Sequence, residues 1–244
     1  MVKRPIHRLD NGTFLPEFDE LSEEVIVELS TLDEPIVKIL ATPNDLLDLA
    51  YGHIYSESRG EISSAKVDGN NVIIVGEINP RPVEDILTAA CGACSTGELE
   101  VPMESVTSNA VFRGTIKQVM DDMISNQPVF EKTGGVHAAA VIDESGKILY
   151  IREDIGRHNA MDKAIGAAIR DNYKPKIIAM SSRIGWELVA KAVRSNIPLI
   201  IAAGAISSAA ESLARSSNIT LVGFASQEKP MIIGPTSRIV DKRK

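Results

Sequence analysis

Two consecutive strand–turn–helix units in the last third of the chain constrain the fold more than any other feature. The apolar run IIAM (177–180) precedes SSR and a helical pattern, and LIIAA (199–203) precedes GAISS and a second helical pattern. A third apolar run, ITLVGF (219–224), follows. This order predicts a parallel sheet with right-handed crossovers, and near-continuous apolar strands indicate burial on both faces.

Ligands of such sheets bind at the carboxyl ends of the strands. The residues expected at this rim are Ser181, Ser182, Arg183, Gly204 and Ser207. Helix capping explains the serines equally well, because Ser before a helix satisfies free backbone N–H groups. Arg183 is more informative, since a cation beside a helix N-terminus is disfavoured unless an anion lies between them.

The pattern of predicted helices and strands becomes more regular after about residue 105. After it, we expect a helix around 116–123, a hairpin over 136–151 and a helix over 160–169. Before it, the patterns predict a hairpin over 24–40, a helix with Thr42 as N-cap, and a strand over 71–78. We therefore predict an α/β protein with two parts. Residues 1–105 form a small α+β subdomain that carries both cysteines, and residues 106–244 form a larger α/β domain with a largely parallel sheet.

The charge balance excludes several classes of partner. The net charge is −7, and no segment is rich in Lys and Arg, which argues against nucleic-acid and membrane-surface binding. There is no run of about 18 apolar residues, and the start MVKRPIHRLDNG lacks the apolar stretch of a signal peptide. We expect a cytoplasmic protein, in which thiols remain reduced.

A dense polar cluster, REDIGRHNAMDK (152–163), lies between a predicted strand and a predicted helix. It is either a solvated loop with internal ion pairs, each worth about 0–1 kcal/mol, or a recognition loop for a large phosphorylated ligand. Just upstream, Gly134 and Gly135 precede a strand that begins with His137. These glycines permit close backbone approach or positive φ, although a lone histidine at a strand start is more often structural.

The only two cysteines, Cys91 and Cys94, stand two residues apart in CGAC. A zinc site needs about four ligands, and no second ligand pair has a matching spacing. A zinc-dependent nucleobase deaminase uses H-x-E followed by P-C-x-x-C, but here the order is reversed and Ala139 and Ala90 replace the Glu and the Pro. A redox pair and a sulfur relay, in which a thiolate carries sulfur as a persulfide, also fit. The spacing alone leaves carrier, redox and metal interpretations open.

Several long segments resemble the formate dehydrogenase accessory sulfurtransferase family, FdhD. They cover almost the whole chain in order: residues 33–57, CGAC (91–94), TGGVHAAA (133–140), REDIGRHNAMDKAIGA (152–167), 181–210 and LVGFA (221–225). The resemblance implies a sulfur carrier that accepts sulfur from a cysteine desulfurase. It delivers this sulfur to the molybdenum or tungsten bis-pterin guanine dinucleotide cofactor of formate dehydrogenase, Mo-bis(molybdopterin guanine dinucleotide) or its tungsten analogue. It also implies a homodimer and a cytidine-deaminase-like, three-layer fold for the larger domain.

By position, the resemblance assigns the persulfide to Cys91 and makes Cys94 its partner thiol, with no metal bound directly by the protein. A non-catalytic chaperone that binds the cofactor is the alternative. The anionic cofactor would explain the cations Arg152, Arg157, His158, Lys163 and Arg183 near the turns at the sheet edge. We expect cofactor contacts from Gly135, His137, Arg157, His158 and Arg183.

The C-terminal segment departs from the family pattern. Where the family has a hydrophobic-Asn-x-Tyr-Thr segment, this chain reads KPMIIGP (229–235), and Ser95 replaces a glycine after the second cysteine. We expect the segment in the equivalent place to contact the cofactor, through Pro230, Met231, Ile232, Ile233, Gly234 and Pro235.

Overall fold

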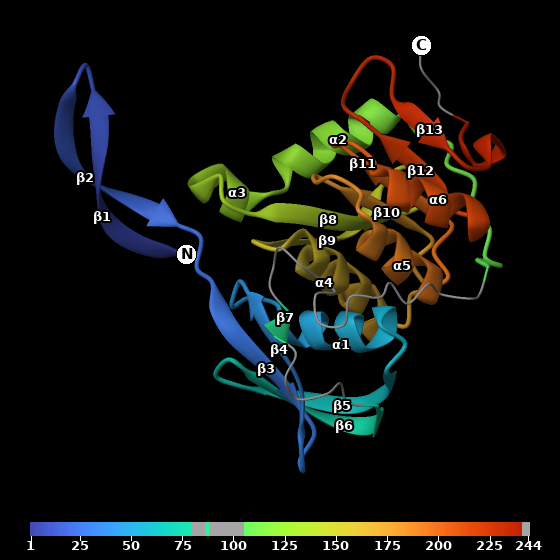
Figure 1. The fold of residues 1–244 in the computed structure, drawn as a ribbon, viewed down its shortest axis with the longest axis horizontal. Helices are drawn as coiled ribbons and strands as arrows, with labels where there is room; N and C mark the ends of the chain where they lie inside the picture. Colours follow the sequence, from blue (N-terminus) through green and yellow to red (C-terminus); the bar gives the residue numbers. More distant parts are fainter. Residues whose placement is uncertain (80–85, 88–104, 241–244) are drawn as a thin grey trace.

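The computed structural model describes residues 1–79, 86–87 and 105–240 (Figure 1). The strands are β1 Val2–Asp10, β2 Thr13–Leu21, β3 Val25–Ser30, β4 Pro35–Ala41, β5 Gly60–Asp68, β6 Asn71–Ile78, β7 Ile86–Leu87, β8 His137–Ile142, β9 Ile148–Asp154, β10 Ile177–Met180, β11 Leu199–Ala202, β12 Thr220–Gly223 and β13 Met231–Ile233. The helices are α1 Leu46–Ser56, α2 Ile116–Ser125, α3 Pro128–Thr133, α4 Arg157–Arg170, α5 Trp186–Arg194 and α6 Ser208–Ser216, with a 3₁₀ turn at Thr236–Arg238.

The six-stranded C-terminal sheet has the order β13-β12-β11-β10-β8-β9. Strands β10, β11 and β12 are parallel, as the doubled unit predicts. The neighbours β8, β9 and β13 all pair antiparallel. The prediction of a largely parallel sheet is therefore wrong. The sheet is mixed because the hairpin β8–β9 and the returning strand β13 need no crossover helix.

Helices cover both faces of this sheet. Alternate strand residues, such as Val141, Ile178 and Ile200, pack against α4, α5 and α6 on one face. Their neighbours, such as Ala140, Ala179 and Ile201, pack with α2 and Phe112 on the other. Burial on both faces is the reason that these strands read as unbroken apolar runs. The arrangement is a mixed α/β fold, and the cytidine-deaminase-like, three-layer description stays a prediction.

The N-terminal region contains two further sheets. The five-stranded sheet has the order β5-β6-β3-β4-β7 and buries one face against α1, with Leu29, Ile39 and Ile74 in its core. The predicted hairpin is confirmed as β3–β4, and the predicted strand over 71–78 as β6. Strands β1 and β2 form a separate two-stranded hairpin that extends away from the rest of the molecule (Figure 1).

Helices α1 and α4 pack against each other where the N-terminal sheet meets the C-terminal layers (Figure 1). Their backbones touch at two glycines. A Cβ atom at Gly52 would overlap the carbonyl oxygen of Asp162, and one at Gly166 would overlap the carbonyl oxygen of Asp48. Glycine is therefore required at both positions because of close approach.

The predicted N-cap of the first helix is wrong. Helix α1 begins at Leu46, after Asp45 in a left-handed conformation. Thr42 lies before it, and its hydroxyl accepts the backbone N–H of Ile155 at 3.0 Å. Thr42, which the sequence pattern suggests as a helix cap, instead connects the N-terminal and C-terminal parts of the chain.

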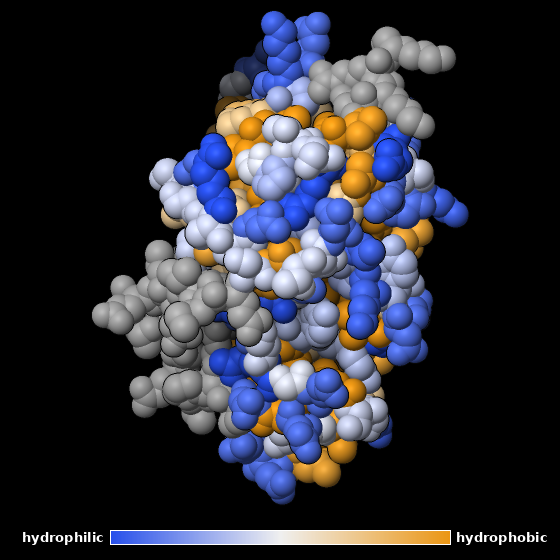
Figure 2. All heavy atoms as spheres, turned by 90° about the vertical axis from the view of Figure 1, so that its right-hand side faces the viewer, coloured by the Kyte–Doolittle hydropathy of each residue, from blue (hydrophilic) through white to orange (hydrophobic). Residues whose placement is uncertain are grey.

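No helix in the described ranges is long and apolar enough to cross a membrane. On the face shown in Figure 2, hydrophobic side chains occur in small groups between polar ones.

Candidate anion-binding site

Three segments that are far apart in the sequence meet at the carboxyl end of β10. Ser181, which follows β10, donates its backbone N–H to the carbonyl of Ala138 at 3.0 Å, and its hydroxyl accepts the N–H of Ala138 at 2.9 Å. The preceding residue, His137, pairs with Asp154 at the end of β9. The start of β8, the β9–α4 turn and the loop after β10 therefore form one edge.

This edge carries two arginines and two histidines, which we call the basic rim: His137, Arg157, His158 and Arg183. Burial lowers the pKa of His137, and the positive charges of Arg157 and Arg183 lower it further. Arg183 is exposed, whereas Arg157 and His137 are half-buried. The structure thus brings four of the predicted contact residues together, with a local excess of positive charge on an acidic chain.

His158 has an unusual environment. It is 3% exposed, and neither ring nitrogen has a hydrogen-bond partner among the described residues. Its Nε2 lies 3.8 Å from Oε2 of Glu187, which is an electrostatic contact longer than a hydrogen bond. The His158 side chain lowers the pKa of Glu187 to about 2. Buried polar atoms normally have partners, so two buried nitrogens without a hydrogen bond among the described residues are unusual.

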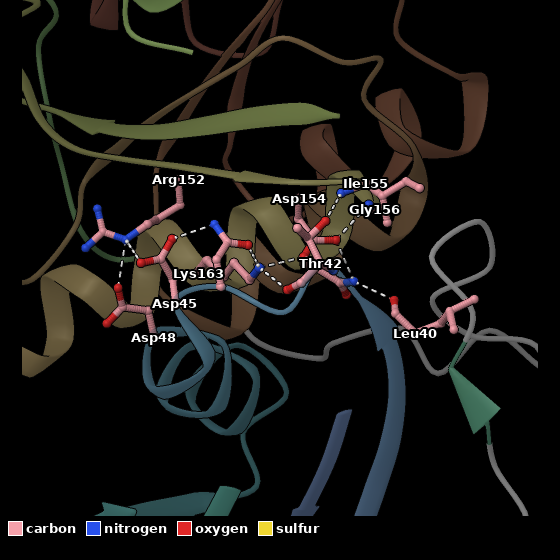
Figure 3. Close-up of polar contacts among 11 residues, drawn as sticks. Leu40, Thr42, Asp45, Asp48, Arg152, Asp154, Ile155, Gly156 and Lys163 are labelled. Carbon is pink, nitrogen blue, oxygen red and sulfur yellow. Dashed lines mark hydrogen bonds and ion pairs between the residues drawn. The ribbon is translucent and has the colours of Figure 1, made fainter. Parts of the chain in front are cut away.

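A buried ion pair holds the β9–α4 turn in place (Figure 3). Lys163 and Asp154 are both fully buried, with Nζ 2.7 Å from Oδ2. Lys163 also donates to the carbonyl of Thr42 at 2.9 Å, and Asp154 accepts the N–H groups of Thr42 at 3.0 Å and Gly156 at 2.8 Å. These bonds connect the end of β4 to the first turn of α4, where Arg157 and His158 lie.

The cations of the polar cluster therefore have two different roles. Lys163 belongs to the buried pair, and Arg152 bonds Asp48 at 2.7 Å (Figure 3). Their expected place near a bound anion is wrong, because carboxylates from the structure already neutralise them. Only Arg157 and His158 of this cluster join the basic rim.

A second buried cluster anchors α4 to α1 and α5. Lys191 of α5 is 3% exposed, and its Nζ lies 2.8 Å from Asp162 and 2.7 Å from Glu57. The hydroxyl of Ser56 donates to Asp162 at 2.6 Å, and Arg194 bonds Glu57 at 3.0 Å. The sequence did not signal this cluster, because its members lie on three separate helices.

The serines at the rim differ in function. Ser207 caps α6 by accepting the N–H of Ala210 at 3.2 Å, which confirms the capping interpretation for that residue. Ser182 donates to the carbonyl of Arg183, and α5 begins only at Trp186. Arg183 is therefore not at the helix N-terminus. Arg183 lies against Gly204, because a Cβ atom added to Gly204 would be 2.9 Å from the Cα atom of Arg183.

The glycines before β8 also differ. Gly134 has φ +61 and ends α3, so it needs the left-handed conformation. Gly135 is exposed, and a Cβ added there would lie 2.6 Å from the hydroxyl oxygen of Ser22. Gly135 lies close to the basic rim because it precedes His137 by two residues in the sequence.

The C-terminal segment runs along the outer edge of the sheet, antiparallel to β12. Met231 pairs with Gly223, so Pro230 and Met231 lie at the same end of the sheet as the basic rim. Four strand spacings separate β13 from β8, a distance of about 19 Å. Ile232 is 37% exposed and Ile233 is buried. Gly234 and Pro235 lie toward the opposite end, beside Ile219 and Thr220.

The predicted persulfide pair lies outside the described residues, since Cys91 and Cys94 fall in the range 88–104. Within the described ranges, no group of three or more His, Asp, Glu or Cys side chains is placed to hold a metal ion.

Comparison with known proteins agrees with this architecture. The model of the FdhD/NarQ family matches residues 22–240. The chain is 34% identical over 237 residues to a protein from Sulfurisphaera tokodaii named sulfur carrier protein FdhD, over 91% of this chain and 93% of the relative. A Streptomyces coelicolor protein of the same name is 31% identical over 252 residues, over 91% and 89% of the two chains.

A solved structure shares the fold. The crystal structure of a protein from Desulfotalea psychrophila, assigned as a formate dehydrogenase accessory protein, matches with a TM-score of 0.78 and 19% identity. The match covers 98% of this chain and 99% of that one.

Proposed function

Because this chain belongs to the FdhD/NarQ family, we propose that it is a sulfur carrier that serves formate dehydrogenase. Its donor is a cysteine desulfurase. The acceptor, which is substrate rather than resident cofactor, is the molybdenum or tungsten bis-pterin guanine dinucleotide of formate dehydrogenase. The carrier acts in the cytoplasm as a homodimer.

Loading is a thiol exchange. The Cys91 thiolate attacks the outer sulfur of the persulfide on the desulfurase, the S–S bond of the donor breaks, and the donor cysteine leaves as a thiolate. Cys91 then carries the sulfur and its proton as a new persulfide, so that atoms and electrons balance without an external oxidant. Cys94 is the partner thiol.

The basic rim supports the choice of acceptor. Arg157, Arg183 and His137 gather at the sheet end where α/β proteins bind ligands, and His158 lies beside them. Phosphate groups prefer such sites, because arginine donates charge-assisted hydrogen bonds. The two guanine dinucleotide arms of the acceptor supply these phosphates, and Pro230 and Met231 provide an apolar contact further along the same edge.

The test of the carrier function is a mass measurement. Purified protein incubated with a cysteine desulfurase and cysteine should gain the mass of one sulfur atom, and the gain should disappear in Cys91→Ala. Cys94→Ala is the matched control, and it should still load. Formate dehydrogenase activation should also be lost in Cys91→Ala.

Two outcomes would contradict this function. An unloaded protein beside a control acceptor that loads would exclude the carrier role. Intact formate dehydrogenase activation by Cys91→Ala would instead favour the non-catalytic cofactor chaperone.

Arg183→Gln tests the basic rim. We expect it to weaken guanosine diphosphate binding about tenfold or more, since a hydrogen bond to a charged group contributes about 1.5–3 kcal/mol. Isothermal titration calorimetry measures this change. Arg113→Gln is the control, because Arg113 is also exposed but follows Phe112, which packs with α2. If Arg183→Gln binds guanosine diphosphate as tightly as Arg113→Gln does, the basic rim is not the phosphate site.

A further inference from the structure

The hairpin β1–β2 is the least buried part of the described chain. It pairs Val2 with Leu21 at its base and Asp10 with Thr13 at its tip, and it extends away from the body (Figure 1). It precedes residues 22–240, which the family model matches. The hairpin lies outside that matched range, although the Desulfotalea psychrophila structure covers 98% of this chain.

The two faces of the hairpin differ in chemistry. Directly paired residues share a face, and successive pairs alternate between faces. One face carries the ion pairs of Arg8 with Glu17 at 2.8 Å and with Asp19 at 2.7 Å. The other face, which we call the apolar stripe, consists of four pairs from base to tip: Lys3–Glu20, Pro5–Phe18, His7–Pro16 and Leu9–Phe14.

The apolar stripe is exposed to an extent that needs an explanation. Leu9 and Phe18 are each 67% exposed and Phe14 is 69% exposed. An isolated two-stranded hairpin is at best marginally stable in water, and it needs a covered apolar face. On the face in Figure 2, by contrast, hydrophobic side chains occur in small groups between polar ones. The stripe is thus expected to be covered when the protein functions.

The order of residues in the stripe is complementary to a second copy of the same stripe. Its β1 side carries Lys3, Pro5 and Leu9, and its β2 side carries Glu20, Phe18 and Phe14. If two hairpins stack face to face with a two-fold axis along their length, each β1 lies over the β2 of the other copy. Lys3 then faces Glu20 of the partner subunit, and the small or aliphatic β1 residues face the phenylalanines. Stacking base to tip would instead bury Lys3 and Glu20 against Leu9 and Phe14, which is costly.

We propose that the apolar stripe of the β1–β2 hairpin is a dimerisation surface that stacks on the same stripe of a second copy of this chain. The contact is isologous, because every β1 residue meets a β2 residue and the reverse. The inference rests on the homodimer within the proposed function, and it assigns the surface that makes this homodimer.

Sedimentation velocity of the full chain at several concentrations tests this assignment. We expect a dimer, and we expect Phe14→Ser with Phe18→Ser to raise the dimer dissociation constant at least tenfold. Leu15→Ser is the matched control, since Leu15 is 40% exposed on the charged face. It should associate as the parent chain does. Circular dichroism verifies that each variant keeps its fold.

Charge exchange provides a second, independent readout. Lys3→Glu should weaken the dimer because it places two glutamates opposite each other, and adding Glu20→Lys should restore the dimer. A parent chain that stays monomeric, association unaffected by the two serines, or failure of the exchange to restore the dimer would each overturn the proposal. A monomer whose stripe is covered only when formate dehydrogenase is added would also overturn it.

Persulfide loading is measured on the same samples. A protein that is monomeric but accepts sulfur would overturn only the dimerisation proposal. A protein that is dimeric but accepts no sulfur would overturn only the proposed sulfur-carrier function.

Discussion

Lys191→Met is expected to lower the free energy of unfolding by about 3–5 kcal/mol, because it leaves two buried carboxylates without their shared cation. Nζ of Lys191 lies 2.8 Å from Asp162 and 2.7 Å from Glu57, and both carboxylates are buried. Methionine fills a similar volume, so that lost charge rather than a cavity accounts for most of the effect. Urea denaturation at neutral pH measures the change.

The same variant should reverse the pH dependence of stability. Although burial raises the pKa of Glu57, the Lys191 ammonium lowers it to about 2, and the ordinary value is 4.5. Lys191 likewise holds the pKa of Asp162 below its ordinary range against the opposing effect of burial. This contribution to stability is fully present above about pH 4.5, and it is lost as the pH falls toward 2.

Without Lys191, burial remains the largest influence on the pKa of Asp162 and raises it, whereas His53 opposes this effect. The Lys191→Met variant should therefore gain stability on acidification over the range in which the parent chain loses it. Lys117→Met is the control. Lys117 is exposed and pairs with Asp121 one turn away, so its removal should change the stability by about 0.5 kcal/mol or less. A variant as stable as this control at neutral pH would contradict the assigned role of Lys191.

Gly52→Ala should have a comparable or larger effect. The added methyl group overlaps the carbonyl oxygen of Asp162, which is backbone and cannot rotate away. Helix α1 must then move from α4, and the Lys163–Asp154 and Lys191–Asp162 contacts beside the crossing move with it. We expect a loss of about 3 kcal/mol or more, measured by thermal and urea denaturation.

Gly185→Ala is the matched control for this substitution. A Cβ at Gly185 meets only the flexible carboxylate of Glu187, at 3.0 Å, and the backbone there has negative φ. Its stability should stay within about 1 kcal/mol of the parent chain. If Gly52→Ala behaves in the same way, the close contact of α1 and α4 is not essential.

The grouping of the basic-rim residues at one edge of the sheet could be predicted from the sequence. His137, Arg157 and Arg183 each follow or begin a strand with a clear apolar pattern, and adjacent strands bring such positions to one edge. Lys163 and Arg152 are basic residues of the same segment as Arg157, and the sequence does not distinguish the three. Only their carboxylate partners, Asp154 and Asp48, distinguish them, and those partners depend on packing between the two parts of the chain.

Local periodicity and long motifs were enough to predict the doubled strand–helix unit over 177–224, the hairpins β3–β4 and β8–β9, and membership of the family. Four features became visible only in the folded chain: the antiparallel edges of the sheet, the glycine contact of α1 with α4, the Lys191 cluster and the exposed apolar stripe. These features join or expose residues according to how separate elements pack. Hydrophobic periodicity identifies which face of an element is buried, but it does not specify the element against which that face packs.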